Sequence, residues 1–133
     1  MATIKEDYVS FETAKLLKEK GFDEQTRFAY TESGKADFSS LTRYWNQGSL
    51  YACPSQSMAM KWLREVHNIQ IELNWDKGNQ LYSFQIWKLG KYQPEISSLE
   101  LWRIYKDDNY PGEWKYEEAC EAAIKYCLEE NLI

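Results

Sequence analysis

The chain has 133 residues and a mass of 15.8 kDa, so we expect a single domain over residues 1–133. Hydrophobic residues make up 44% and charged residues 28%, values that exclude a fibrous or largely disordered protein. The net charge of −5 disfavours nucleic acid as the main partner, because affinity for phosphates depends on Lys and Arg. Twelve of the 21 acidic residues follow His67, so the second half of the chain carries the negative charge.

The first third of the chain predicts one helix and two strands. Ser10 is placed to cap a helix that Gly21 ends, with Val9 and Ala14 at the positions of a hydrophobic staple. Residues 25–31 suit a strand, and residues 44–53 suit a second strand, interrupted near residues 46–48. We expect residues 35–40 to form an exposed loop between them.

A second helix is predicted over residues 54–67, with Pro54 in its first turn, where a missing N–H costs little. Met58, Trp62 and Val66 recur every four residues and give this helix one apolar stripe.

The clearest pattern is a hairpin around residues 76–79. Apolar residues alternate with polar ones on both sides of the turn, at Ile69, Ile71, Leu73, Trp75, Tyr82, Phe84 and Ile86. A short turn at residues 78–79 would pair Trp75 with Tyr82, whereas a four-residue loop would pair Leu73 with Tyr82. Both registers place these residues on one face, because the side-chain period of a strand is two.

A further strand is predicted over residues 99–106, then a polar break over residues 107–112 and a last helix over residues 116–130. The back face of the sheet would carry Leu81, Trp87 and Leu89. These elements predict an α+β fold with three helices on a mainly antiparallel sheet of four to five strands, in the order α-β-β-α-β-β-β-α.

The cysteines and the single histidine favour structural roles. Cys120 and Cys127 would lie about 10 Å apart along a helix, too far for a disulfide. Cys53, Cys120 and Cys127 are therefore expected to be reduced core residues, with a reactive thiol as the alternative. His67 stands at the end of a predicted helix, where it suits a structural cap.

No motif for metal, nucleotide or nucleophilic chemistry is visible in the sequence. There is no CxxC, HxxxH or HExxH pair, and no glycine-rich phosphate loop. The adjacent acids Asp107 with Asp108 and Glu117 with Glu118 are expected to be solvated surface. We therefore predict no cofactor, no metal and no catalytic residue.

The aromatic content is the unusual feature, with six Trp, ten Tyr and five Phe. These side chains can form the core, a protein interface, or a stacking surface for unpaired bases. The tryptophans in question are Trp45, Trp75, Trp87, Trp102 and Trp114. We name Trp87 and Trp102 as the candidate partner-binding residues.

Three stretches, residues 8–22, 53–67 and 116–128, resemble small proteins from phages and mobile elements of gut bacteria of the Bacteroides type. They read YVSFETAKLLKEKGF, CPSQSMAMKWLREVH and YEEACEAAIKYCL. The resemblance implies an accessory protein made inside a bacterial cell, and it implies no reaction.

We thus expect a non-enzymatic interaction module that binds a protein or associates with itself through the back face of the sheet. One alternative is a binder of single-stranded nucleic acid that uses sheet aromatics together with Lys15, Lys18, Lys61 and Arg64. The other alternative is an enzyme whose site is built from dispersed acids and tyrosines. The longest apolar run is four residues, against the roughly 20 that cross a bilayer, and no apolar signal segment is visible, so we expect a cytoplasmic location without membrane contact.

Overall fold

The computed structural model describes residues 6–37, 46, 48–78, 80–93, 98–106 and 115–130. Its elements in chain order are α1 (Phe11–Glu19), β1 (Phe28–Tyr30), β2 (Ala36–Asp37), β3 (Tyr51–Cys53), α2 (Gln56–His67), β4 (Ile69–Asp76), β5 (Leu81–Gln93), β6 (Ser98–Lys106) and α3 (Tyr116–Glu129). The predicted α+β class, with three helices and antiparallel strands, is confirmed. The strands form two separate sheets, ordered β2-β1-β3 and β4-β5-β6, where we expected one.

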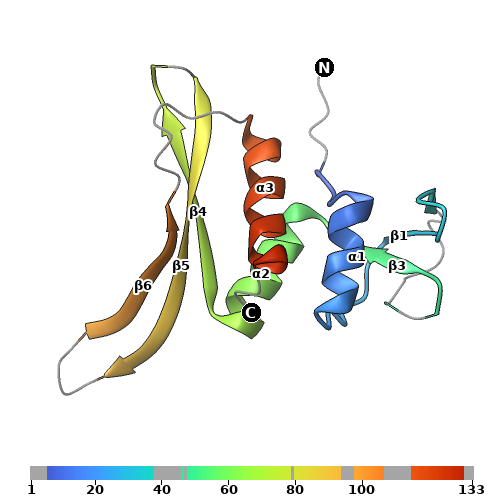
Figure 1. Cartoon of the computed structure of the whole chain (residues 1–133), viewed down its shortest axis with the longest axis horizontal. Helices are drawn as coiled ribbons and strands as arrows, with labels where there is room; N and C mark the ends of the chain where they lie inside the picture. Colours follow the sequence, from blue (N-terminus) through green and yellow to red (C-terminus); the bar gives the residue numbers. More distant parts are fainter. Residues whose placement is uncertain are drawn as a thin grey trace.

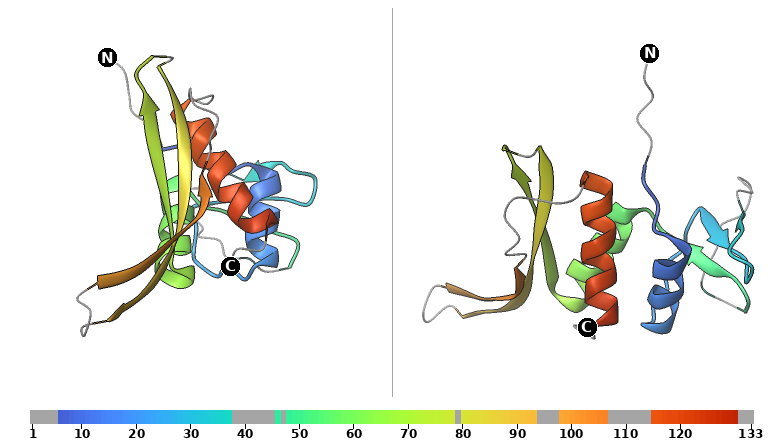
Figure 2. Two further views of the ribbon diagram at one scale, coloured as in Figure 1. Left: turned by 60° about the vertical axis from the view of Figure 1, so that its left-hand side comes forward. Right: turned by 45° about the horizontal axis from the view of Figure 1, so that its top comes forward.

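The helices lie between the two sheets (Figure 1). One side of the molecule is the β4-β5-β6 sheet, followed by α2 and α3, then α1, and then the smaller sheet on the opposite side (Figure 1; Figure 2). Helix α3 contacts β4, β5, α1 and α2, so it joins both halves of the fold. The largest fully buried side chains include Phe22, Leu17, Leu63, Ile69, Ile86, Ile124 and Leu128.

Serine side chains cap the first two helices. The Oγ of Ser10 accepts the N–H of Thr13 at 3.2 Å, which confirms the predicted start of α1. Helix α2 begins later than predicted, because Ser55 is its cap and accepts the N–H of Met58 at 3.1 Å. Pro54 lies before this cap, fully buried, and its carbonyl accepts the N–H of Val9 at 3.1 Å.

The β4–β5 hairpin adopts the first of the two predicted registers. Trp75 pairs with Tyr82, and Ile71 pairs with Ile86. The buried Asp76 fixes the turn, since its carboxylate accepts the N–H of Gly78 at 3.0 Å and its carbonyl accepts the N–H of Gln80 at 2.7 Å. The predicted apolar face is confirmed in the part of the hairpin away from the turn, where Ile71, Phe84 and Ile86 are buried.

The first half of the chain forms shorter strands than predicted. Residues 35–40 were expected to be a loop, but Ala36 and Asp37 form β2 and pair with β1. The chain reverses because the N–H of Thr31 donates to the carbonyl of Lys35 at 2.8 Å, with Gly34 between them at φ +83°. Of the predicted strand over residues 44–53, Tyr51–Cys53 form β3, whereas the described residues 46 and 48–50 are not part of a strand. Residues 44, 45 and 47 lie outside the described residues, as does the predicted break over residues 107–112.

Candidate functional site

Three aromatic side chains meet where the outer end of the β4–β5 hairpin approaches the start of α3. The ring centroids of Trp75 and Tyr82 lie 5.0 Å apart, and those of Tyr82 and Tyr116 lie 5.2 Å apart in an edge-on arrangement. Trp75 is 54% exposed and Tyr116 is 51% exposed. We call Trp75, Tyr82 and Tyr116 the aromatic cluster.

The exposure of the aromatic cluster follows from the direction of the hairpin. Burial decreases along β4, since Ile69 and Ile71 are buried, Leu73 is half-buried and Trp75 is exposed. The hairpin turn and the first turn of α3 lie at the same end of the molecule (Figure 1). The alternation therefore continues past the part of the sheet that the helices cover, and its last members remain in contact with solvent.

An open groove of about 530 Å³ runs between the chain that enters α1 and the start of α3. Its apolar lining consists of Tyr8, Val9, Tyr30 and Ala122. Its charged lining consists of Asp7, Glu117, Glu118 and Glu121. Among the described residues that line it there is no Lys or Arg, so we call it the acidic groove.

The groove is shaped by the extended chain before α1. The N–H of Gln56 donates to the carbonyl of Asp7 at 2.8 Å, and Tyr8 forms a β-bridge with Ser55. The Gln56 side chain is buried and its amide donates to the carbonyl of Glu117 at 2.9 Å, which ties this segment to α3. The hydroxyl of Tyr30 donates to the carbonyl of Val9 at 2.8 Å. These bonds connect the segment before α1 to α2, α3 and β1, the elements that carry the other lining residues.

The acidic groove adjoins the aromatic cluster. A second hollow of about 250 Å³ shares Asp7 and Gln56 with the groove and is also lined by Glu6, Met60 and Tyr116. Tyr116 therefore belongs both to this hollow and to the aromatic cluster. The result is one continuous surface that combines exposed aromatic rings with carboxylates.

The tyrosines of the groove contribute no negative charge at neutral pH. Burial, together with the nearby Glu6 carboxylate, raises the pKa of Tyr8, and burial raises the pKa of Tyr30 further. Both hydroxyls therefore stay protonated, and the charge of the groove comes from its carboxylates.

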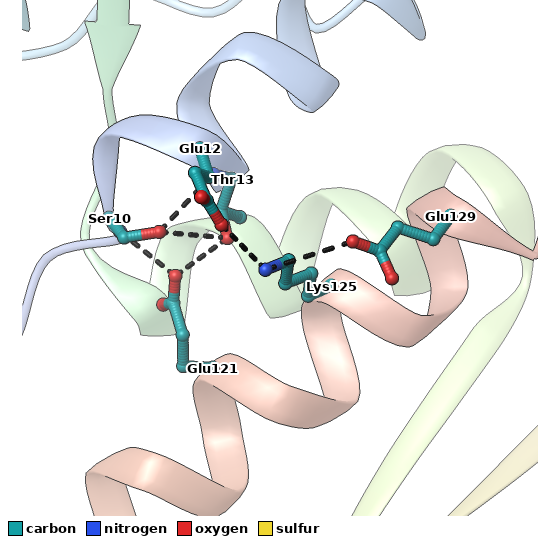
Figure 3. Close-up of polar contacts among 6 residues, drawn as sticks. All are labelled: Ser10, Glu12, Thr13, Glu121, Lys125 and Glu129. Carbon is teal, nitrogen blue, oxygen red and sulfur yellow. Dashed lines mark hydrogen bonds and ion pairs between the residues drawn. The ribbon is translucent and has the colours of Figure 1, made fainter. Parts of the chain in front are cut away.

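One carboxylate of the groove is bound within the fold. Glu121 Oε1 accepts the N–H of Ser10 at 2.9 Å and the hydroxyl of Thr13 at 2.6 Å (Figure 3). These groups lie at the N-terminus of α1, where the helix dipole stabilises an anion. Beside them, Lys125 Nζ lies 2.7 Å from Glu12 Oε2 and 3.7 Å from Glu129 Oε1 (Figure 3). Helices α1 and α3 are thus joined through polar side chains.

Trp87 and Trp102, the residues named from the sequence, lie on β5 and β6. Trp87 is half-buried, and its indole N–H donates to Glu72 Oε2 at 3.0 Å. The register pairs Trp87 with Arg103 and Lys88 with Trp102, so the two tryptophans are not cross-strand partners. The side chain of Trp102 is not among those that the structure describes. The proposed role of Trp102 in binding a partner stays a prediction.

His67 packs as a neutral ring. Its ring centroid lies 4.6 Å from that of Trp62, and its Nε2 is buried without a hydrogen-bond partner. Burial and the nearby Lys88 ammonium lower the pKa of His67. The end of α2 is capped by Asn68 in the left-handed conformation, and Lys88 Nζ donates to the carbonyl of His67 at 2.9 Å. The structural role is therefore packing, and a cation that contacts this helix end is Lys88.

The three cysteines are free and buried, as predicted. Burial raises the pKa of Cys53 and Cys120 to about 11 and that of Cys127 to about 12. The thiolate is the reactive form, so these side chains are poor nucleophiles.

A third hollow, of about 270 Å³, lies on the outer face of α2. It is lined by Glu24, Met58, Lys61, Trp62, Glu65 and Val66. Val66 is 54% exposed, as Trp75 is, but the charges around it are of both signs. Because Val66 is as exposed as Trp75, a substitution of Val66 can serve as the control for substitutions in the aromatic cluster.

Within the described ranges, no group of three or more His, Cys, Asp or Glu side chains could hold a metal ion. No helix in the same ranges is long and apolar enough to cross a membrane. No protein-family model, no curated protein and no solved structure matches the chain. The resemblance to proteins of phages and mobile elements therefore stays a prediction.

Sequence reasoning missed the aromatic cluster as a site. The alternation of β4 and β5 identified the face that carries Trp75 and Tyr82, but it could not show where the covering helices begin. Glu117 and Glu118 were read as the solvated first turn of a helix, although they also line the groove. The available signal was the placement of Tyr116 directly before these two acids.

Proposed function

We propose that this protein is a non-enzymatic module that binds another protein, and that the aromatic cluster is its contact surface. The observation that carries the proposal is the exposure of Trp75 and Tyr116 by about half, at 54% and 51%. Tryptophan and tyrosine are enriched at protein interfaces, where they anchor binding in pockets of the partner.

The arrangement of the cluster supports this role. Tyr82 lies between the other two rings, at 5.0 Å from Trp75 and 5.2 Å from Tyr116, so each ring limits the motion of its neighbour. A side chain that is already ordered loses less conformational entropy when a partner binds. Exposed aromatic area on side chains that already pack against one another therefore favours association.

The nucleic-acid alternative receives less support from the basic residues named for it. Lys18 Nζ donates to the carbonyls of Gly48 and Leu50 and lies 4.7 Å from the ring centroid of Tyr51. Lys15 lies over the ring of Phe11 at 5.0 Å. The Lys18 ammonium is therefore engaged within the fold, and Lys15 and Lys18 lie on a different helix from Lys61 and Arg64.

The experiment is an affinity isolation from a bacterial lysate with the tagged protein, with and without nuclease treatment. The test variant is Trp75→Ser with Tyr116→Ser, and the matched control is Val66→Ser, which removes an equally exposed apolar side chain from α2. We expect a specific protein to be retained in both nuclease arms by the wild type and the control, and to be lost with the double variant.

Two results would overturn the proposal. Retention of the partner by the double variant would exclude the aromatic cluster as the contact surface. Recovery that disappears after nuclease treatment would favour the nucleic-acid alternative. Circular dichroism of each variant confirms that the fold is intact.

A further inference from the structure

We infer that the acidic groove binds a basic polypeptide segment of the partner, one that carries apolar side chains between its Lys or Arg residues. This inference rests on the proposed function, because the groove adjoins the aromatic cluster and would extend the same interface. It adds the chemical class of the partner.

The lining of the groove selects this occupant. Tyr8, Tyr30 and Ala122 are half-buried and leave apolar surface in the groove, while Asp7, Glu117 and Glu118 are exposed acids that line it. The described lining contains no cation that would neutralise these acids. A ligand that fills the groove must therefore supply both positive charge and apolar surface, which alternating basic and apolar residues do.

The carboxylates of the groove differ in their availability. Glu121 already accepts bonds from Ser10 and Thr13, so its charge is partly used by α1. Glu118 Oε1 accepts the N–H of Lys115 at 3.2 Å and helps to begin α3. Asp7 and Glu117 bond within the fold through their backbone carbonyls, and both residues are exposed. Asp7 and Glu117 are therefore the acids that a basic segment would pair with.

The dimensions also favour an extended segment over a compact ligand. The groove of about 530 Å³ continues into the hollow of about 250 Å³ through Asp7 and Gln56. Tyr116, which lines that hollow, also belongs to the aromatic cluster. A partner anchored on Trp75 could thus place its adjoining chain along a line of carboxylates.

The test uses three fluorescent synthetic peptides and the full-length protein. The first peptide alternates lysine with leucine, the second replaces leucine by serine, and the third replaces lysine by glutamate. We expect the first peptide to bind most tightly, the second more weakly, and the third not at all, as measured by fluorescence anisotropy.

Two charge variants distinguish the effect of the groove carboxylates on peptide binding from the effect of the net charge of the protein. Asp7→Asn with Glu117→Gln changes the groove, whereas Glu19→Gln with Glu32→Gln changes exposed acids that do not line it. Each pair removes two acids and takes the net charge from −5 to −3. We expect the groove variant to weaken binding of the lysine–leucine peptide about fivefold and the control variant by less than about twofold, since exposed charge pairs contribute modestly.

Equal weakening by both charge variants, or equal binding of the leucine and serine peptides, would overturn the inference in favour of general charge attraction. Sedimentation without peptide tests a second copy of this chain as the occupant: a wild-type dimer that only the groove variant dissociates would also overturn it. If the Trp75→Ser and Tyr116→Ser double variant loses its partner while no peptide binds the groove, the proposed function stands and this inference fails.

Discussion

Ile71 and Ile86 are cross-strand partners on the β4–β5 hairpin and both are buried, whereas Trp75 and Tyr82 hold the same relation four residues further out and Trp75 is largely exposed. We call the first region the packed end and the second the open end. Both ends follow one alternating pattern, and they differ in whether α2 and α3 cover them (Figure 1). The comparison teaches that one hairpin supplies core at one end and partly exposed aromatic side chains at the other.

The largest expected effect is at the packed end. Ile86→Ala removes a fully buried side chain beneath the helices and should lower the free energy of unfolding by about 2–5 kcal/mol. Trp75→Ser, at the open end, should lower it by less than about 1 kcal/mol, because its ring is already half in water. Urea unfolding followed by circular dichroism measures both. Equal losses would show that the open end is part of the core.

Two glutamates on α3 extend the comparison along one helix. Glu121→Ala leaves the N–H of Ser10 and the hydroxyl of Thr13 without their acceptor and should cost about 1–3 kcal/mol. Glu117→Ala removes an exposed carboxylate and should cost less than about 0.5 kcal/mol. The same unfolding measurement decides between them, and a larger loss for Glu117 would contradict the assignment of Glu121 to the α1–α3 contact.

His67 gives the packed end a pH dependence. Its pKa is lowered in the folded state by burial and by Lys88, so the unfolded chain, with a pKa near 6.5, binds the proton first as the pH falls. Stability is therefore full above about pH 6.5 and declines below it, until the pH reaches the lowered pKa of the folded state. Melting temperatures between about pH 5 and 7 should show this decline in the wild type and a smaller one in His67→Gln. Parallel profiles would assign the decline to other groups.

The sequence predicted helix starts and turns well, for physical reasons. Ser10 caps α1 as expected, and the turn fixed by Asp76 selects the register with the shorter loop. A helix cap or a turn depends on residues that are only a few positions apart, so its position can be predicted from the sequence. Ser55 was missed because Pro54 also suits the start of a helix.

The open end and the acidic groove could not be predicted in the same way. Asp7, Tyr30, Gln56 and Glu117 are distant in sequence, and only the folded chain brings them to one groove. Likewise, the exposure of Trp75 depends on where α3 begins relative to the hairpin, which is a property of packing. Trp87 and Trp102 were named from the aromatic excess of the chain and from strand alternation, which assigns a residue to a face of the sheet but does not distinguish the two ends of the sheet.

The most direct test of the account is a hydrogen-exchange footprint of the isolated complex against the free protein. We expect new protection at residues 74–83 and 116–122, with exchange at residues 58–66 of α2 unchanged. Protection confined to the outer face of α2 around Met58 and Val66, with the open end unaltered, would contradict it.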